Sequence, residues 1–590
     1  MESNAINRSN PPIIYLLLAA ITILALFLRF YKLGEWSFWI DELFTIRDAF
    51  NHNTISIGDV YLIDPRQDYG FSFASITLLF IRWVLTTFGI SEFNARFIPA
   101  LVGSLSIPIF YFPIRRIIGS QIALVTVFFL AISPWHMFLS QNARYYTPLI
   151  VFATLSLFAF YFSLEKNNPW YLLLSLFFLI LATLERIHAL FFLPVVGAYI
   201  ILLVFLPFGK KPAGLTRKNI ALVTLIPVII YLLYEAFYYF VLQRDTFLQV
   251  FLSPKFLGQL TARPQWLLTG VVTDVGTPLA VLAVIGGISL LFRRNRLGLL
   301  LILAIVIPLA ALMVLAPFFQ TSIHYMIVSL PAWIILGAAG LVELYYQAQK
   351  KWGLAMVVGT LLLIGGLFLR DRVIRDVLYF YGPQLDSSTV LLAGLGVALL
   401  GGAGVLAVGL SVFQRQDNHS LPDSAHSYAQ TLPRSSAGSR KNLAVAVWAF
   451  VLLPVLLLHP LITNQMYYAY QHGYRDNNWK AAMSSLARFH MEGDLVLSAM
   501  PPVASYYLGV KVEDLDGFAI EKALASGQRL WIVEEYGAYQ SKGNEFRNWI
   551  TVNCQRVAEF DRYVRGRDWP MRVVICPPDP GVDRIDLTGL

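Results

Sequence analysis

The chain has 590 residues, of which 57% are hydrophobic and 14% are charged, and its mean hydropathy is +0.61. This balance excludes an ordinary soluble protein, and repeated runs of about 18 or more apolar residues indicate a polytopic α-helical membrane protein. The net charge of +9 does not indicate a nucleic-acid partner, because the basic residues lie in short clusters between apolar runs, where they set membrane topology.

The first apolar run, residues 12–30, is too long for the core of a signal peptide and lacks a small-residue cleavage site, so we expect it to span the membrane. Counting this run, the apolar pattern predicts about thirteen transmembrane helices. The others lie near residues 97–114, 120–139, 146–164, 170–184, 189–207, 219–240, 277–292, 298–316, 326–346, 353–369, 389–413 and 443–462.

A cytoplasmic N-terminus places nearly all the basic clusters on the cytoplasmic side, as the positive-inside rule requires. This topology holds only if the apolar segment 71–89 lies in the membrane interface, because a further crossing would turn nearly every cluster outward. Three arginines do not fit the topology: Arg370, Arg372 and Arg375.

We expect residues 31–96 to form the first external loop, and its most unusual stretch is Trp36–Asp48. Two adjacent carboxylates, Asp41 and Glu42, lie there among aromatic side chains. Apolar residues recur at intervals of three to five positions, which predicts an amphipathic helix on the membrane surface. Neighbours on a helix point about 100° apart, so the two carboxylates are expected to have different roles. A solvated acidic pair at a helix start, where the macrodipole favours carboxylates, is the plainer interpretation and stays open.

Ionisable and aromatic residues gather at those span ends that face the same side as the acidic pair. Such residues are costly near the bilayer and are therefore candidates for function. Taken singly, each has a plainer explanation, because arginines reach lipid headgroups and tyrosines anchor helix ends in an aromatic belt. Their gathering on one side predicts a charged site at the external leaflet. The selected residues are Arg96, Arg144, Tyr145, His188, His324 and Tyr325.

The composition divides the chain into a transmembrane module, residues 1–463, and a polar region, residues 464–590. Residues 414–441 are rich in Gln, Asp, Asn, Ser and Pro, which predicts a cytoplasmic linker inside the first part. The polar region is expected to be a small extracytoplasmic α/β domain. Its predicted elements are a helix over residues 478–491 and strands over residues 494–498, 529–534 and 571–576.

The two cysteines of the chain, Cys554 and Cys576, both lie in the polar region and have no metal-ligand spacing. An oxidising compartment allows such a pair to form a disulfide. A single disulfide is therefore allowed if this region is extracytoplasmic, and the sequence leaves open whether it forms.

Two carboxylates facing cations beside a bilayer suit transfer chemistry on an anionic lipid. One carboxylate can act as the general base on an acceptor hydroxyl, and the cations can stabilise the phosphate that departs with the lipid. The second carboxylate, Glu42, can orient the first or hold a divalent cation, which is the one cofactor that the pattern allows. Trp36 and Trp39 can offer flat apolar faces to a sugar ring.

Three stretches, Trp36–Leu43, Phe88–Gly103 and Ser133–Tyr146, resemble the GT-C glycosyltransferases. The resemblance is to the family-39-like branch, which is related to protein O-mannosyltransferases and lipid A aminoarabinose transferases, and it is dense over about residues 12–210. It implies that Asp41 is the catalytic base and that the sugar is transferred with inversion. It also implies that Arg96 and Arg144 are donor-phosphate or structural arginines and that His188 takes the place of a polar residue after the fifth span.

The chain departs from these relatives at two positions. Where many relatives carry a Pro-Pro-Leu-Tyr-like stretch, this chain has Asp64–Gly70, so donor contacts from that loop are not carried over. Where relatives often carry Arg-Tyr, it has His324-Tyr325, which predicts weaker or pH-dependent phosphate recognition there.

The sequence thus predicts a multi-pass glycosyltransferase of the plasma (inner) membrane, with a cytoplasmic N-terminus. Its expected partners are a polyprenyl-phosphate-linked sugar, membrane lipid and an extracytoplasmic acceptor that is a protein, a lipid or a glycan. The identities of sugar and acceptor stay open. A transporter or flippase of a lipid-linked sugar is the main alternative, although it would need a polar pathway across the bilayer. A non-catalytic scaffold is the second.

Overall fold

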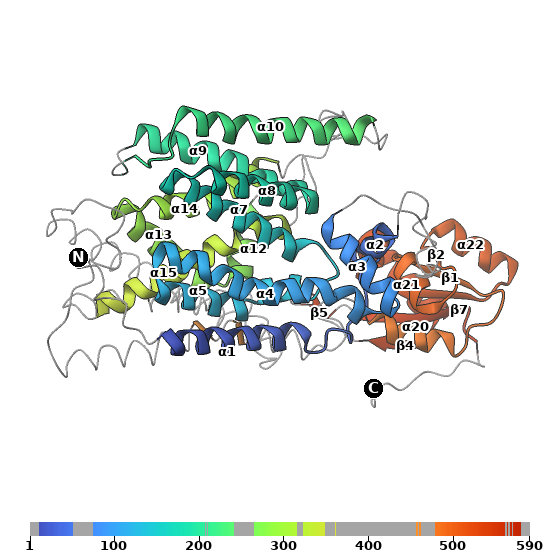
Figure 1. Ribbon diagram of the computed structural model, residues 1–590. Coiled ribbons are helices and arrows are strands. Elements are labelled where there is room, and N and C mark those ends of the chain that lie inside the picture. The colour runs from blue at the N-terminus through green and yellow to red at the C-terminus, as the bar shows by residue number, and fades with distance from the viewer. Residues whose placement is uncertain are drawn as a thin grey trace. The chain divides into compact units, whose positions relative to one another are not determined.

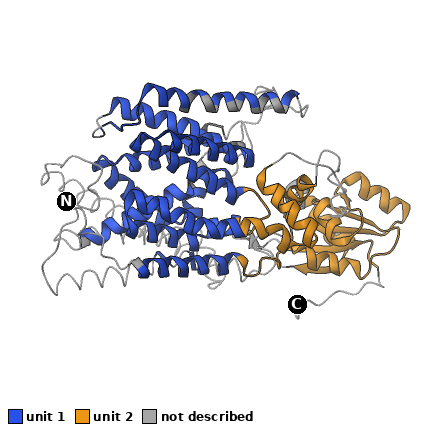
Figure 2. Ribbon diagram, viewed as in Figure 1, with its two compact units in different colours: residues 1–29, 101–139, 146–462 blue, residues 30–100, 140–145, 463–590 orange. Residues whose placement is uncertain are grey.

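The computed structural model describes residues 11–50, 75–206, 208, 211–240, 265–315, 323–348, 360, 456–457, 460–461, 478–560, 563–564, 567–568 and 570–579. The chain divides into two compact units (Figure 2). The helical unit comprises residues 1–29, 101–139 and 146–462. The α/β unit comprises residues 30–100, 140–145 and 463–590, so the predicted first external loop is grouped with the C-terminal region and not with the transmembrane helices.

The described part of the chain contains six helices that are long and apolar enough to cross a membrane. The chain is therefore a multi-pass membrane protein, as predicted. The predicted spans 353–369, 389–413 and 443–462 lie almost entirely outside the described residues, so the total of thirteen stays a prediction. Helices of the membrane part are α1 (Pro11–Phe30), α4 (Glu92–Ile118), α5 (Ser120–Ile132), α6 (Pro134–Ser140), α7 (Tyr146–Lys166), α8 (Pro169–Glu185), α9 (Phe192–Phe205), α10 (Arg217–Phe240), α12 (Gln265–Val275), α13 (Thr277–Phe292), α14 (Arg296–Leu315) and α15 (Leu330–Ala348), with 3-10 turns η2 (Ile187–Phe191) and η3 (Ile323–Ser329).

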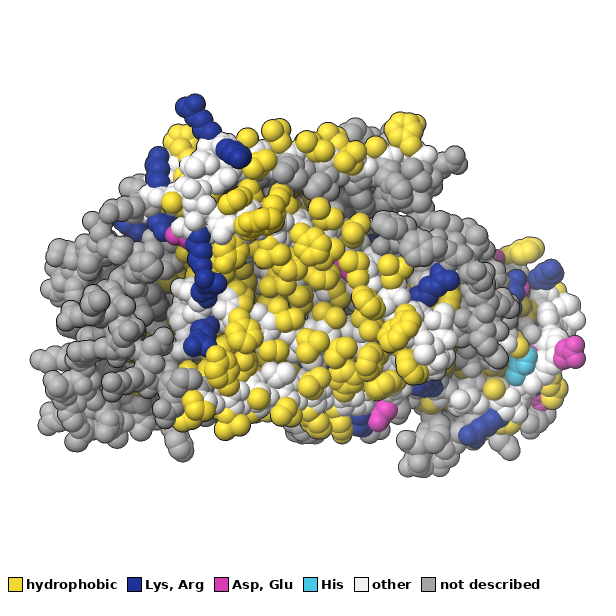
Figure 3. Space-filling model, in the orientation of Figure 1, with side chains coloured by type: hydrophobic (Ala, Val, Ile, Leu, Met, Phe, Trp, Pro, Cys, Tyr) yellow, Lys and Arg dark blue, Asp and Glu magenta, His cyan; other side chains and the backbone are white. Residues whose placement is uncertain are grey.

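The surface of the helical unit is strongly apolar (Figure 3). Large hydrophobic side chains are exposed along its outer helices, among them Trp170, Phe177 and Phe205. Water would disfavour such a surface, whereas the hydrocarbon of a bilayer solvates it. Basic residues occupy helix ends instead: Arg115 and Arg116 lie in the last turn of α4.

Two membrane helices, α13 and α15, pack against each other (Figure 1), and a pair of glycines lies at their contact. A Cβ atom on Gly286 would collide with the Leu336 carbonyl oxygen, and one on Gly340 would collide with the Leu282 carbonyl oxygen. Small residues allow this close backbone approach, which is a common basis of helix association in membranes.

The bend between α5 and α6, which is 57°, follows from Pro134. In a continuous helix the carbonyl of Leu130 would accept a hydrogen bond from the backbone N–H of residue 134, and proline has none. The fully buried Arg29, at the end of α1, takes that place: its Nη2 donates to the Leu130 oxygen (3.2 Å) and its Nη1 to the Ala131 oxygen (3.0 Å). Nη2 also lies 2.7 Å from Nδ1 of His136. Arg29 was not selected from the sequence.

Helix α3 (Ile76–Phe88) occupies most of the segment that was expected to lie in the interface. It has 13 residues, or about 20 Å of helix, which is too short for a hydrocarbon core of about 30 Å. One face of α3 is buried, while Phe80, Trp83 and Phe88 are exposed. These features fit the predicted interfacial helix.

The C-terminal part of the α/β unit is built on a five-stranded mixed sheet with the order β2-β1-β3-β7-β4. Strands β2 and β3 pair with β1 in parallel, and β7 pairs antiparallel with β3 and β4. The three strands predicted from the sequence are β1, β3 and β7. The elements are α20 (Trp479–Ala487), β1 (Leu495–Ser498), α21 (Pro501–Leu508), β2 (Glu513–Asp514), α22 (Gly517–Ser526), β3 (Leu530–Glu534), α23 (Tyr536–Asn553), β4 (Gln555–Phe560), β5 (Tyr563–Val564), β6 (Arg567–Asp568) and β7 (Met571–Cys576).

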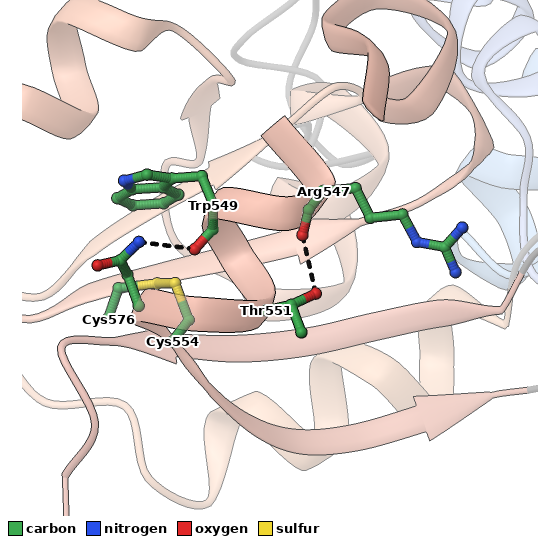
Figure 4. Close-up of a disulfide and its surroundings, with 6 residues drawn as sticks. Arg547, Trp549, Thr551, Cys554 and Cys576 are labelled. Atoms are coloured by element: carbon green, nitrogen blue, oxygen red, sulfur yellow. Dashed lines mark hydrogen bonds between the residues drawn. A yellow bond between two sulfur atoms is a disulfide. The ribbon is translucent and has the colours of Figure 1, made fainter. Parts of the chain in front are cut away.

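A buried apolar layer supports the sheet. Leu497 of β1 is paired in register with Ile532 of β3, and Ile532 is paired with Val574 of β7, and all three side chains are buried. Cys554 and Cys576 form a disulfide, which joins the residue after α23 to the end of β7 and answers the question that the sequence left open (Figure 4).

Candidate active site

The acidic pair lies in the first turn of helix α2 (Ile40–Ala49). A carboxylate is favoured there because the exposed N–H groups of a helix start carry partial positive charge. Glu42 reaches back so that its Oε2 accepts a hydrogen bond from the backbone N–H of Trp39 (3.3 Å). The side chain of Glu42 is fully buried, whereas that of Asp41 is 33% exposed. The two neighbours therefore have different surroundings, as their angular offset predicts.

The buried carboxylate of Glu42 forms a bidentate ion pair with Arg96 of α4. Arg96 Nε donates to Oε1 and Nη2 donates to Oε2, both over 2.7 Å. The remaining N–H groups of Arg96 donate to three backbone carbonyls of the preceding segment, those of Leu33, Trp36 and Ser37, over 3.0–3.1 Å. All five N–H donors of the guanidinium are thus used inside the protein. Arg96 fixes the chain between α1 and α2.

This geometry corrects three predictions. Arg96 has no N–H left for a donor phosphate, so it is a structural arginine. Each oxygen of Glu42 accepts two hydrogen bonds, the fourth from the backbone N–H of Ala143 (2.8 Å), so Glu42 does not fit the role of metal ligand. The described residues also contain no cluster of three or more His, Cys, Asp or Glu side chains able to hold a metal. Trp36 is 3% exposed and has no open ring face for a sugar, whereas Trp39 is half-buried.

Arg144 is the ion-pair partner of the exposed carboxylate. Its Nη2 lies 3.5 Å from Asp41 Oδ2, and its Nη1 donates to the Asp41 carbonyl (2.8 Å) and to Oγ1 of Thr45 (2.9 Å). The same guanidinium stacks over the ring of Tyr145, 4.7 Å from its centroid, and donates to the Tyr145 hydroxyl (2.8 Å). Arg144 therefore holds the first turn of α2 and keeps a cation beside Asp41.

The turn that carries Arg144 is itself attached to the acidic loop. The backbone N–H of Ala143 donates to Oε1 of Glu42 (2.8 Å), and Nε2 of Gln141 donates to the carbonyl oxygen of Tyr31 (3.3 Å). Asp41, Glu42, Arg96, Arg144 and Tyr145 are thus brought together from three separate stretches of sequence, all within the α/β unit.

The other predicted site residues lie in the helical unit. The His188 ring stacks on Tyr325 with centroids 4.0 Å apart, and His324 stacks on Phe138 (6.1 Å) and contacts the ring of Tyr146 (5.8 Å). His188 also lines a pocket whose other walls are almost entirely apolar side chains of α7, α9, α14 and α15. His188, His324 and Tyr325 therefore gather at 3-10 turns η2 and η3, where two membrane helices begin.

The protein was compared with known families and structures. Residues 75–231 match the model of the family described as dolichyl-phosphate-mannose-protein mannosyltransferase. The chain is also 28% identical over 251 residues to an uncharacterized protein of Aquifex aeolicus strain VF5, a match that covers 40% of this chain and 46% of the relative. The matched region thus spans just under half the length of that relative.

Among solved structures, ArnT from Cupriavidus metallidurans bound to undecaprenyl phosphate superposes with a TM-score of 0.50 and 14% identity, over 96% of this chain and 98% of ArnT. The oligosaccharyltransferase AglB from Archaeoglobus fulgidus, in complex with an inhibitory peptide and a dolichol-phosphate, gives a TM-score of 0.49 and 11% identity, over 98% of this chain and 75% of AglB. The similarity to ArnT and the family match confirm the predicted resemblance to the GT-C glycosyltransferases, and the chain has the GT-C fold.

Proposed function

We propose that this protein is a membrane glycosyltransferase that moves a sugar from a polyprenyl-phosphate carrier to the hydroxyl group of an acceptor. One observation carries the proposal: the two adjacent carboxylates have different surroundings, because Glu42 is fully buried in an ion pair while Asp41 is one third exposed beside Arg144. The GT-C fold and the lipid phosphate in the ArnT structure support a lipid-linked donor.

Asp41 is the proposed general base. An exposed carboxylate can accept a proton from an incoming hydroxyl, and a carboxylate with four hydrogen bonds already in place, such as Glu42, cannot do so without breaking them. Glu42 is the proposed positioning residue, because its pairing with Arg96 fixes the start of α2.

In the proposed step, Asp41 takes the proton of the acceptor hydroxyl as the oxygen attacks the anomeric carbon. The bond between that carbon and the phosphate oxygen breaks, and the polyprenyl phosphate leaves with the bonding electrons. A single displacement of this kind inverts the configuration at the anomeric carbon. Arg144 keeps Asp41 oriented toward the reaction.

The departing phosphate gains negative charge and needs hydrogen-bond donors or cations. We retain His188, His324 and Tyr325, together with Tyr145, as the candidates for this contact, and Trp39 as the candidate for stacking on the sugar. We also retain the external face of the plasma membrane as the site of the reaction, with a protein, lipid or glycan as acceptor.

The test is the release of polyprenyl phosphate from polyprenyl-phosphate-linked sugars by the purified full-length protein in lipid, with cell-envelope extract as acceptor. Asp41→Asn is compared with wild type, and Asp48→Asn is the matched control, because Asp48 lies on the same helix with a side chain that is 32% exposed. A parallel reaction with chelator measures whether turnover needs a divalent cation.

We expect wild type and Asp48→Asn to release the lipid phosphate, and Asp41→Asn to bind donor but release at least about a hundredfold less. Equal turnover by Asp41→Asn and wild type would overturn the assignment of the base. Movement of the intact lipid-linked sugar between leaflets, without release of phosphate, would favour the flippase instead.

A further inference from the structure

The segment Gly34–Phe38, which links α1 to α2, is also held by the C-terminal part of the chain. Its Trp36 and Ser37 carbonyls accept hydrogen bonds from Arg96, as described above. In addition, the backbone N–H of Phe38 donates to the hydroxyl of Tyr507 over 2.6 Å. Tyr507 lies on α21, the helix that follows strand β1. All these residues belong to the α/β unit.

Tyr507 connects the segment to the first turn of α4. Its hydroxyl donates to Oε1 of Glu92 over 2.7 Å while accepting from Phe38. Burial, together with the nearby Glu92 carboxylate, raises the pKa of Tyr507 far above its usual range. The hydroxyl therefore keeps its proton, and both hydrogen bonds have one fixed direction.

Lys480 of α20 makes a second connection to the same two partners. Its Nζ lies 3.0 Å from Glu92 Oε1 and donates to the carbonyl of Gly34 over 2.9 Å. Its backbone N–H donates to Oγ of Ser37 over 3.2 Å. Glu92 is thus bound by both Tyr507 and Lys480, and each of these residues also binds the segment directly.

These hydrogen bonds hold residues that lie close to Asp41 in the sequence. Phe38 is three residues before Asp41, its side chain is fully buried, and its ring packs edge-on against Tyr506. A buried backbone N–H that loses its acceptor is costly, so the segment would move to recover one. Movement of this segment would displace the first turn of α2, which carries Asp41.

We infer that Tyr507 and Lys480 are positioning residues for Asp41, so that the C-terminal α/β region completes the support of the active site that Arg96 begins. The inference rests on the proposed function, because it assigns these residues to the reaction of Asp41. Neither residue touches the reacting atoms. Their effect is on the geometry of the Trp36–Glu42 segment.

The decisive variant is Tyr507→Phe, which removes one oxygen and keeps the ring. Tyr506→Phe is its matched control, because it removes a hydroxyl from the adjacent residue and, within the described part of the chain, that hydroxyl makes no hydrogen bond. Lys480→Met is the second test variant, since it keeps the length of the side chain and removes the ammonium group.

The first readout is amide hydrogen exchange of the full-length protein in lipid, without donor or acceptor. We expect peptides covering residues 33–44 to exchange on the order of tenfold faster in Tyr507→Phe, with peptides of β3 and β7 unchanged and with Tyr506→Phe equal to wild type. This readout does not depend on the proposed reaction. Unchanged exchange of the segment in both Tyr507→Phe and Lys480→Met would overturn the inference.

The second readout is the release of polyprenyl phosphate. We expect kcat, measured well below the melting temperature of the variant, to fall about tenfold to a hundredfold in Tyr507→Phe, with KM for the donor within about twofold of wild type. A residue with only a structural role would lower the melting temperature and leave kcat of the folded protein unchanged, and that result would overturn the inference. If wild type releases no phosphate while exchange responds as expected, the proposed function fails and the segment contact stands alone.

Discussion

Two buried arginines show how differently the two units of this protein use the same side chain. In the helical unit, Arg29 donates to the carbonyls of Leu130 and Ala131 where Pro134 interrupts a helix. In the α/β unit, Arg96 donates to three carbonyls of a segment that is not helical and also pairs with Glu42. The first arginine repairs a break in regular structure. Arg96 instead fixes a segment that has no regular secondary structure, and this segment leads into the helix that carries Asp41.

This difference has an electrostatic reason. Arg29 is bound by backbone carbonyls and lies beside a histidine ring nitrogen, whereas Arg96 shares its site with a buried carboxylate, and each ion of the Arg96–Glu42 pair would be strongly disfavoured without the other. Removing one member of the Arg96–Glu42 pair should therefore cost more than removing Arg29.

The largest effect is expected for Arg96→Lys. Lysine keeps the positive charge but replaces five N–H donors in a planar arrangement with three on one atom, so it cannot bind Glu42 and three carbonyls together. We expect a loss of about 3–5 kcal/mol in the free energy of unfolding and loss of turnover. Thermal melting in detergent and phosphate release measure the two effects. Arg116→Lys, an exposed change on the same helix, should stay within about 0.5 kcal/mol of wild type.

Arg29→Leu should cost less, about 1–3 kcal/mol, because it removes hydrogen-bond donors from buried carbonyls, whereas a change of Arg96 takes the bidentate partner away from the buried Glu42 carboxylate. A double-variant experiment uses Pro134→Ala, which restores a backbone N–H for the Leu130 carbonyl. In that background we expect Arg29→Leu to cost less than in wild type, by at least about 0.5 kcal/mol. Strictly additive melting data for the double variant would contradict the role given to Arg29.

A loss of stability of similar size is expected at a helix contact in the helical unit. Gly340→Ala places a methyl group against the Leu282 carbonyl, and we expect it to destabilise the protein by about 1–3 kcal/mol through separation of α13 and α15. Gly197→Ala on α9 is the control, because no atom lies within 4 Å of the added Cβ. Equal melting temperatures for the two variants would show that the close crossing does not matter.

The smallest effect is expected at a half-buried group of three charged residues in the α/β unit, Glu559, Arg556 and Arg572. Burial acts to raise the pKa of Glu559, but the hydrogen bonds and charges of Arg572 and Arg556 outweigh it and hold the pKa below its usual value. A carboxyl whose pKa is lowered on folding adds stability above its unfolded pKa, and that stability is lost as pH falls through the folded pKa.

Glu559→Gln should therefore flatten the acid side of the stability profile and leave the Arg96–Glu42 pair unaffected. Melting temperatures measured from pH 7 down to pH 3 check this, with wild type losing more stability than the variant across that interval. A steeper acid loss in the variant would reverse the sign that the geometry assigns to Glu559.

Local sequence patterns predicted the parts of this protein that depend on near neighbours. The apolar runs predicted the membrane helices, and β-branched runs predicted β1, β3 and β7. The angular offset of adjacent helix residues predicted different tasks for Asp41 and Glu42. Helix α23 was missed because its sequence is largely polar and carries little apolar periodicity, and α12 was missed because it is short, with 11 residues.

The pairings that build the site could not be predicted in this way. Arg96 lies 54 residues from Glu42, and Tyr507 lies 469 residues from Phe38. An arginine at the end of a span has the same local sequence pattern whether it binds a phosphate or, as Arg96 does, five acceptor atoms of its own protein. The partners of such a residue are set by the fold. The sequence therefore predicted a donor-phosphate role for Arg96 and gave no signal for Tyr507, Lys480 or Arg29.

The most direct test of the account compares the two adjacent carboxylates in one experiment: single-turnover release of polyprenyl phosphate and melting temperature for Asp41→Asn and Glu42→Gln. We predict that Asp41→Asn melts like wild type and releases at least about a hundredfold less phosphate, whereas Glu42→Gln melts several degrees lower because a buried charge of Arg96 loses its partner. If Asp41→Asn keeps wild-type release, or if Glu42→Gln melts like wild type and alone abolishes release, the division of tasks between the two carboxylates is contradicted.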